Sequence, residues 1–162
     1  MRAEFINPFL QAAIDVLATE TGLRVDRGSP RLEPSNRTSH DVNALVEISG
    51  ERIVGLVVVG MAGNTARALV GQILNRPLAE LDELATSGVA ELTNVIASRA
   101  CVLLDAAGYA CTAMPAALIA GAGVRISRPA ARRLVVPLHL SPGTVEIQVA
   151  LKEHGAEVVA RS

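Results

Sequence analysis

The most constraining feature of this sequence is one long helical segment, which the residue pattern predicts over residues 82–107, ended by Gly108. A polar row follows the segment: Ser87, Glu91, Asn94 and Ser98. At about 100° per residue, these side chains fall within about 60° of one another on a helix. An apolar arc is expected beside the row: Leu84, Leu92, Val95, Ile96, Val102 and Leu103. The helix should therefore bury one face and present a carboxylate beside a carboxamide on another.

Asn94 is the most informative member of this polar row. Asparagine is an indifferent helix former, because its side chain competes with the backbone for hydrogen bonds. In the middle of a helix it needs either a function or an exposed location. From these residues alone, a solvated helix face is the favoured interpretation of Glu91 and Asn94, and Ser87 can equally be an ordinary surface residue.

Composition predicts one domain over residues 1–162, because 162 residues with 50% hydrophobic content can build a sizeable core. Aromatic residues make up only 2% of the chain, so that core must be aliphatic. The net charge of −1 and the lack of aromatic stacking platforms argue against nucleic-acid binding. Cys101 and Cys111 have no paired partners or nearby histidine, so we expect free thiols rather than a zinc site.

The sequence also predicts a protein without a membrane segment. No run reaches the ~18 uninterrupted apolar residues that a membrane helix needs. The first residues lack a signal-peptide pattern, because Glu4 comes early and Pro8 and Gln11 interrupt the apolar residues. We therefore expect a soluble, cytoplasmic protein.

The remaining elements follow from hydrophobic periodicity and turn residues. Asn7 can cap a helix that starts at Pro8 and ends at Gly22. The other elements expected are a strand over 23–27, a polar loop over 28–39, strands over 42–49 and 53–61, a helix from 64 or 65 to 74, and strands over 109–113, 118–120, 134–140 and 144–152. Pro137 indicates an edge or a bulge. Because most strands are linked as hairpins, the fold class is α+β with a largely antiparallel sheet and packed helices.

A weak internal repeat accompanies this order of elements. A helix ending in glycine, a short strand, a loop and a hairpin occur twice. Aligning Gly22 with Gly108 places Pro8 opposite Asn94, so only the second copy carries the polar row. The sequence therefore predicts a pseudo-twofold arrangement.

The pattern Ser87-x-x-x-Glu91-x-x-Asn94 resembles the active-site motif of the CheC/CheX/FliY family of chemotaxis phosphatases, and the chain is most similar to the CheX type. The similarity extends to residues 3–9, to residues 38–42 with 48–50, to residues 90–97 and to residues 149–153. A single copy of the motif also resembles CheX, since CheC carries two. The resemblance implies a CheC/CheX-like fold over nearly the whole chain.

The resemblance further implies dephosphorylation of a phosphorylated response regulator of the CheY type. Asn94 would orient the hydrolytic water, Glu91 would pair with a lysine of the regulator, and Ser87 would be a supporting contact. Mg²⁺ would be bound by the partner, so this chain would need no cofactor. The resemblance to CheX-type proteins, which form homodimers, also implies a homodimer here. Two alternatives remain: a non-catalytic CheX-like module that binds a receiver domain, and an unrelated ligand-binding domain with a deep apolar pocket away from residues 87–98.

Several other residues receive structural interpretations. Ser98 and Arg99 stand where family members often have small residues, and Arg99 is expected to project toward the apolar arc. His40, beside Asp41, is expected to make a structural hydrogen bond rather than to act as an acid or base. The segment 60–64 is interpreted as a strand-to-helix turn rather than a phosphate nest. Arg132 and Arg133 are expected to be solvated at a strand start.

Overall fold

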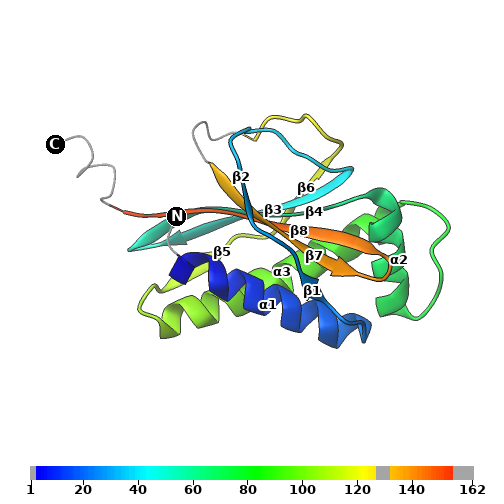
Figure 1. The fold of residues 1–162 in the computed structure, drawn as a ribbon, viewed down its shortest axis with the longest axis horizontal. Coiled ribbons are helices and arrows are strands. Elements are labelled where there is room, and N and C mark those ends of the chain that lie inside the picture. Colours follow the sequence, from blue (N-terminus) through cyan, green and yellow to red (C-terminus); the bar gives the residue numbers. More distant parts are fainter. Residues whose placement is uncertain (1–2, 127–131, 155–162) are drawn as a thin grey trace.

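The computed structural model describes residues 3–126 and 132–154, which form one sheet with helices packed against one of its faces (Figure 1). The helices are α1 (Ala3–Thr21), α2 (Gly63–Leu74) and α3 (Glu83–Ala106). The strands are β1 (Asp26–Arg27), β2 (Arg31–Glu33), β3 (Val42–Gly50), β4 (Ile53–Met61), β5 (Cys111–Ala113), β6 (Ala117–Ala120), β7 (Arg133–Leu140) and β8 (Gly143–Glu153).

The sheet is antiparallel, in the order β1-β7-β8-β4-β3-β5, with β2 also paired to β7 and β6 also paired to β3. Two long hairpins, β3–β4 and β7–β8, meet where β4 pairs with β8, as at Val57 opposite Val149. The predicted α+β class with a largely antiparallel sheet is therefore confirmed.

The main core lies between the sheet and the helices. Because side chains alternate along a strand, every second residue of β3 contributes to it: Val42, Ala44, Val46 and Ile48. Strand β4 is buried on both faces, since Leu56 and Val58 pack with Ile126 and Ala150 on the opposite side of the sheet. The valine-rich run of β4 thus forms the centre of the sheet.

Helix α1 begins at Ala3, so the prediction that it starts at Pro8 with an Asn7 cap is wrong. Pro8 lies inside the helix and cannot donate the usual backbone hydrogen bond there. Burial of the first turn offsets this loss, because Phe5 is only 2% exposed and its ring packs edge-on against Tyr109 with 5.0 Å between centroids. Tertiary packing thereby extends the helix beyond its local signal.

The expected polar loop over 28–39 contains the short strand β2, which its sequence does not indicate. Strands β1 and β2 pair with successive parts of β7, and Pro137 lies at the interruption between them. There the Gly28 N–H donates to the Pro137 carbonyl at 2.8 Å, and a Cβ on Gly28 would come within 2.7 Å of Pro137 Cγ. The expected edge or bulge at Pro137 is thus an interruption in the neighbouring strand.

The strand pairings in the two halves of the chain correspond. Strands β1 and β2 flank β7, while β5 and β6 flank β3. Gly22 and Gly108 each come after the end of a helix, and both glycines have a left-handed backbone conformation, at φ +70° and +93°. These features are those expected of the pseudo-twofold repeat, which stays a prediction from the sequence.

A partly buried ionic cluster holds the segment after β2 on the face of the sheet opposite the helices. The Glu146 carboxylate of β8 accepts two hydrogen bonds from the Arg31 guanidinium, at 2.8 and 3.1 Å. It also contacts His40 Nε2 at 2.6 Å, so His40 makes a structural hydrogen bond as expected. Arg133 is 1% exposed and donates to the Arg37 carbonyl at 2.6 Å. The expectation of a solvated Arg133 is therefore wrong; Arg132 has an exposed side chain.

We expect Glu146→Gln to destabilise the fold by about 2 kcal/mol at pH 7, as for other hydrogen bonds to charged groups. Burial alone would raise the pKa of Glu146, but the hydrogen bonds from His40 and Arg31 hold it at about 2. Because this value lies below the ordinary 4.5, the stabilisation is complete above about pH 4.5 and is lost as the pH falls toward 2.

Urea unfolding of both proteins between pH 7 and pH 2.5 measures this difference. The exposed acid Glu47 on β3 supplies the control. Glu47→Gln should be as stable as the wild type at pH 7 and should lose stability in acid to the same extent. If the Glu146 variant lost stability in acid as steeply as the wild type, the cluster would not be the source of the pH dependence.

Candidate functional site

Helix α3 confirms the helix predicted over residues 82–107. It begins after Asp82, whose side chain accepts a hydrogen bond from the Ala85 N–H at 3.0 Å and caps the helix. Its buried face packs against α1 and the sheet: Ala85, Val89, Leu92, Thr93, Ile96, Ala97, Ala100, Cys101 and Leu104. By length and composition alone α3 could also span a membrane, but here this face is turned into the protein core.

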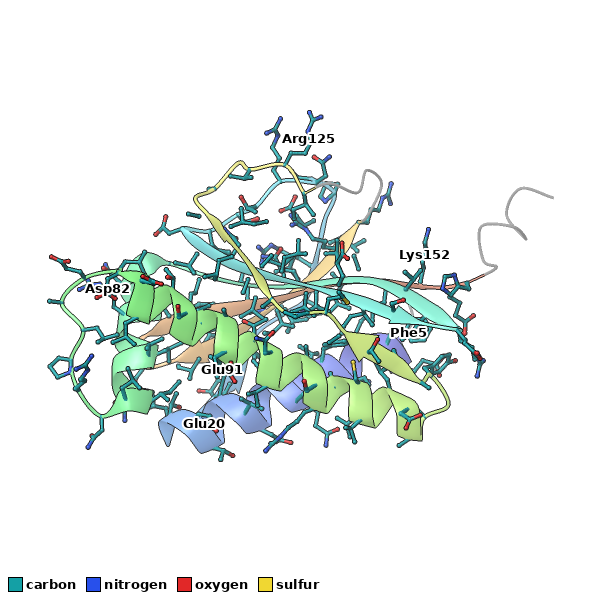
Figure 2. The ribbon with its side chains drawn as sticks, turned by 180° about the vertical axis from the view of Figure 1, so that it is seen from behind. Phe5, Glu20, Asp82, Glu91, Arg125 and Lys152 are labelled. Atoms are coloured by element: carbon teal, nitrogen blue, oxygen red, sulfur yellow. The ribbon has the colours of Figure 1, made fainter. Side chains whose placement is uncertain are left out.

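The polar row lies on the outer side of α3, where Figure 2 shows Glu91. Ser87, Glu91 and Ser98 are exposed, whereas Asn94 is partly buried at the margin of the row. The structure therefore brings the predicted residues onto one accessible face, as their spacing predicts.

The apolar arc expected beside the row is partly wrong. Leu92 and Ile96 are buried, but Leu84 is 40% exposed and Val102 is 69% exposed. Arg99, expected to project toward this arc, is also exposed. The arc of α3 that the sheet and α1 cover is rotated about the helix axis away from Leu84, Arg99 and Val102. Periodicity alone does not predict where the buried arc of a helix ends.

The Asn94 side chain is held by another part of the chain. Its Oδ1 accepts a hydrogen bond from the Ala116 backbone N–H at 2.8 Å. Because this donor requires an acceptor, it identifies which atom of the carboxamide is the oxygen and so orients the whole group. Within residues 3–126 and 132–154, Asn94 Nδ2 has no hydrogen-bond partner, so its two N–H groups are available to another molecule.

Exposed apolar side chains border the polar row on both sides. Leu84 and Val102 lie on α3 itself, while Leu118 (42% exposed) lies on the neighbouring edge of the sheet. Leu118 pairs with Ala44, a core residue, so its side chain is on the face of the sheet that carries the helices. Exposed apolar side chains that gather beside polar ones are a feature of protein interaction surfaces. Sequence reasoning missed Ala116 and Leu118, since short strands and backbone amides leave no periodic signal.

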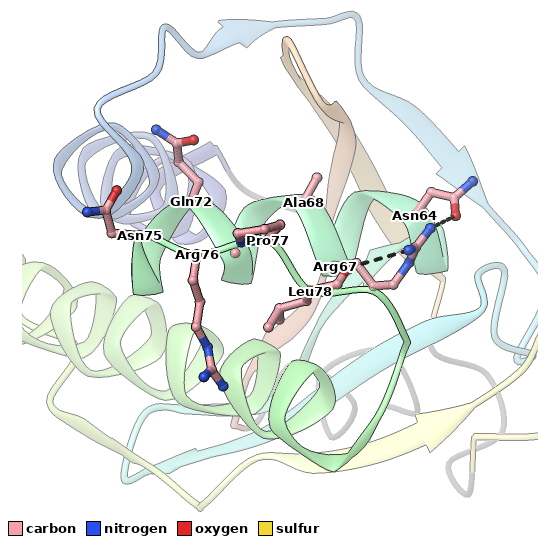
Figure 3. Close-up of a pocket in the computed structure, with 9 residues that line it drawn as sticks. Asn64, Arg67, Ala68, Gln72, Asn75, Arg76, Pro77 and Leu78 are labelled. Carbon is pink, nitrogen blue, oxygen red and sulfur yellow. Dashed lines mark hydrogen bonds between the residues drawn. The ribbon is translucent and has the colours of Figure 1, made fainter.

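Two surface hollows lie outside residues 87–98, although the second includes Val102 of the apolar border, and neither is a deep apolar pocket. The first, shown in Figure 3, follows α2 and the segment after it: Asn64, Arg67, Ala68, Gly71, Gln72, Asn75, Arg76, Pro77 and Leu78. Most of these side chains are polar, and Arg67 is engaged by Asn64 Oδ1 at 2.6 Å and the Ala79 carbonyl at 2.9 Å. This hollow therefore gives no support to the alternative of an apolar ligand-binding domain.

The second hollow lies between the end of α3 and β5 and contains Cys101 and Cys111. Both cysteines are free thiols, as predicted. Burial, with a smaller contribution from the neighbouring Cys111, raises the pKa of Cys101 to about 12, and burial also raises the pKa of Cys111. Since the thiolate is the reactive form, these thiols are poor nucleophiles at neutral pH.

Comparison with known proteins places the chain in a family. The family model of the chemotaxis phosphatase CheX matches residues 42–139. This match spans more than half of the chain, which therefore belongs to the chemotaxis phosphatase CheX family. A comparison with functionally curated proteins finds no match.

Solved structures agree with this assignment. A CheC-like superfamily protein from Shewanella sp. PV-4 is 25% identical with a TM-score of 0.84, over 94% of this chain and 99% of that one. The chemotaxis protein CheX from Desulfovibrio desulfuricans is 25% identical with a TM-score of 0.80, over 93% and 99%. The CheX–CheY–BeF3–Mg²⁺ complex from Borrelia burgdorferi is equally similar, with 25% identity and a TM-score of 0.80 over 94% and 100%.

Proposed function

We propose that this chain hydrolyses the aspartyl phosphate of a CheY-type response regulator, with Asn94 orienting the attacking water. The observation that carries the proposal is the accessible Asn94 carboxamide, oriented by its 2.8 Å hydrogen bond to Ala116, on the same helix face as Glu91. Membership of the CheX family and the existence of a CheX–CheY complex support the class of reaction and of partner.

The chemistry asks little of the phosphatase beyond positioning. The water oxygen attacks phosphorus, the bond from phosphorus to the regulator's carboxyl oxygen breaks, and the products are an aspartate and inorganic phosphate. Such a step depends on in-line placement and on stabilisation of charge. A carboxamide suits the task because it donates and accepts hydrogen bonds without titrating near neutral pH. The glutamine that orients water in small GTPases, a worked case of this chemistry, has the same functional group.

Glu91 is proposed to fix the register of the complex. It lies one helical turn before Asn94 on the same exposed face, so both side chains can reach one partner surface. There the Glu91 carboxylate would pair with the active-site lysine of the regulator, and Ser87 would add a supporting contact. A charge pair that is desolvated on docking contributes more to orientation than a pair left in water.

The regulator is proposed to cover the apolar border together with Ser87, Glu91 and Asn94. Leu84 and Val102 on one side, and Leu118 on the other, supply apolar area around the charged and amide groups. Mg²⁺ is expected on the regulator, so this chain would supply no cofactor. The site is proposed to operate in the cytoplasm, within a single domain over residues 1–162.

A second candidate is a module of the same family that binds a receiver domain without catalysis. The exposed Ser98 and Arg99, at positions where relatives often have small residues, favour this alternative, since a long side chain beside the row limits close approach. In that case the complex would form but phosphate loss would proceed at the intrinsic rate of the regulator.

Asn94→Ala is expected to lower the catalysed decay of a phosphorylated CheY-type domain by about 10²-fold, because the water loses its orienting group. Phosphate release from a labelled regulator, measured with and without each protein, gives the rate. Ser98→Ala is the matched control, because Ser98 is a polar residue of the same row that lies outside the motif. This variant should dephosphorylate the regulator at the wild-type rate. Equal rates for the Asn94 variant and the wild type would rule out the water-orienting role.

Glu91→Ala should mainly weaken engagement of the regulator, because the charge pair that fixes the register is removed. We expect KM to rise about tenfold with a smaller change in kcat, and the wild-type KM to increase with salt more steeply than that of the variant. Steady-state assays at two ionic strengths measure both effects. Loss of kcat at an unchanged KM would instead place Glu91 in the chemical step.

We also propose a homodimer, the assembly implied by the resemblance to CheX-type proteins. Equilibrium sedimentation at micromolar concentration should give a mass near twice that of the 16.9 kDa chain. A mass equal to that of one chain over this range would refute the dimer without affecting the proposed reaction.

A further inference from the structure

We propose that the backbone N–H of Ala116, in the connection between β5 and β6, is a positioning group that holds the Asn94 carboxamide in its working orientation. This inference rests on the proposed function and adds a second structural element to the site. It makes the site a composite of α3, which carries the reacting face, and the sheet edge, which orients the amide.

The donor is itself held in place from both sides. The Met114 N–H donates to the Glu47 carbonyl at 2.9 Å just before the connection, and Ala117 pairs with Leu45 just after it. Both anchors are on β3, which packs beneath α3. The Ala116 N–H therefore occupies a fixed place relative to the helix, and Pro115 next to it restricts the backbone further.

The asparagine side chain needs such a partner to have one orientation. Its terminal torsion is broad, so a solvated asparagine samples several positions of its oxygen and nitrogen. Of the four residues of the polar row, Asn94 is the one that hydrogen-bonds another described element of the chain; Ser87, Glu91 and Ser98 do not. Within the row, this hydrogen bond therefore orients only Asn94, the residue on which the reaction is proposed to depend.

The hydrogen bond leaves the carboxamide able to act. An amide oxygen has two lone pairs, of which Ala116 occupies one, and Nδ2 keeps two N–H donors. The group can still accept from a water and donate to a second oxygen while its plane is set by the sheet edge. Small displacements of a positioning group are costly, since about 1 Å can change a rate by 10²-fold.

Ala116→Pro removes the donor and tests the role directly. With regulator at saturation, we expect kcat to fall about five- to tenfold, the effect of losing one ordinary hydrogen bond, while KM stays within twofold. Ala116→Gly is the conservative variant, because it keeps the N–H and should recover most of the lost rate. A proline variant with the wild-type kcat would overturn the proposal.

Because proline can also disturb the connection, amide hydrogen exchange supplies a second measurement in the intact protein. In the wild type the Ala116 amide should exchange slowly, and Asn94→Ala should speed its exchange about tenfold, whereas Ser98→Ala should not. Equal exchange in the wild type and the Asn94 variant would show that the bond does not form in solution, and would overturn the inference.

The two measurements separate this inference from the proposed function. A wild-type protein that does not speed regulator decay would overturn both the proposed reaction and the positioning role, even with a protected Ala116 amide. A wild-type protein that speeds decay, with Ala116→Pro equally active, would overturn the positioning role alone.

Discussion

Burial of one face of α3 between α1 and the sheet is the constraint on which the rest of the structure depends. Leu92 and Ile96 remove apolar surface from water on that face, and each such side chain contributes about 1.5–3 kcal/mol when fully buried. Once this face is fixed, the helix cannot rotate, and the polar row is left on the outside. The same packing brings Asn94 to the margin where β5 and β6 pass.

The two faces of the sheet have different physical roles. On the helix face, an aliphatic core supports an accessible row of polar side chains with an apolar border. On the opposite face, Glu146 sits among Arg31 and His40, and Arg133 contacts the backbone of the segment at Arg37. Charges buried in this way need partners, so the cluster fixes one arrangement of the segment against the sheet. The candidate reaction surface is remote from this structural cluster.

Much of the fold could be predicted because its signals are local. The hairpins of β3–β4 and β7–β8 follow from alternating or continuous apolar runs next to turn residues, and α3 follows from its period and its glycine stop. The predicted residues Ser87, Glu91 and Asn94 lie on one accessible face for the same reason. The errors occur where distant packing overrides a local rule. Pro8 marked a helix start that the burial of Phe5 moved earlier, and β2 exists because β7 is available to pair with it.

The sequence by itself determined which side chains share the outer face of α3, because helical geometry relates residue spacing to angle. Through its resemblance to the family motif it also predicted a function for that face. Only the tertiary structure decided which apolar residues stay exposed, that Arg133 is buried, and that the Ala116 amide contacts Asn94. The reason is physical: every residue except proline carries a backbone N–H, so such a donor has no signature in the sequence and acquires a role only from its place in space.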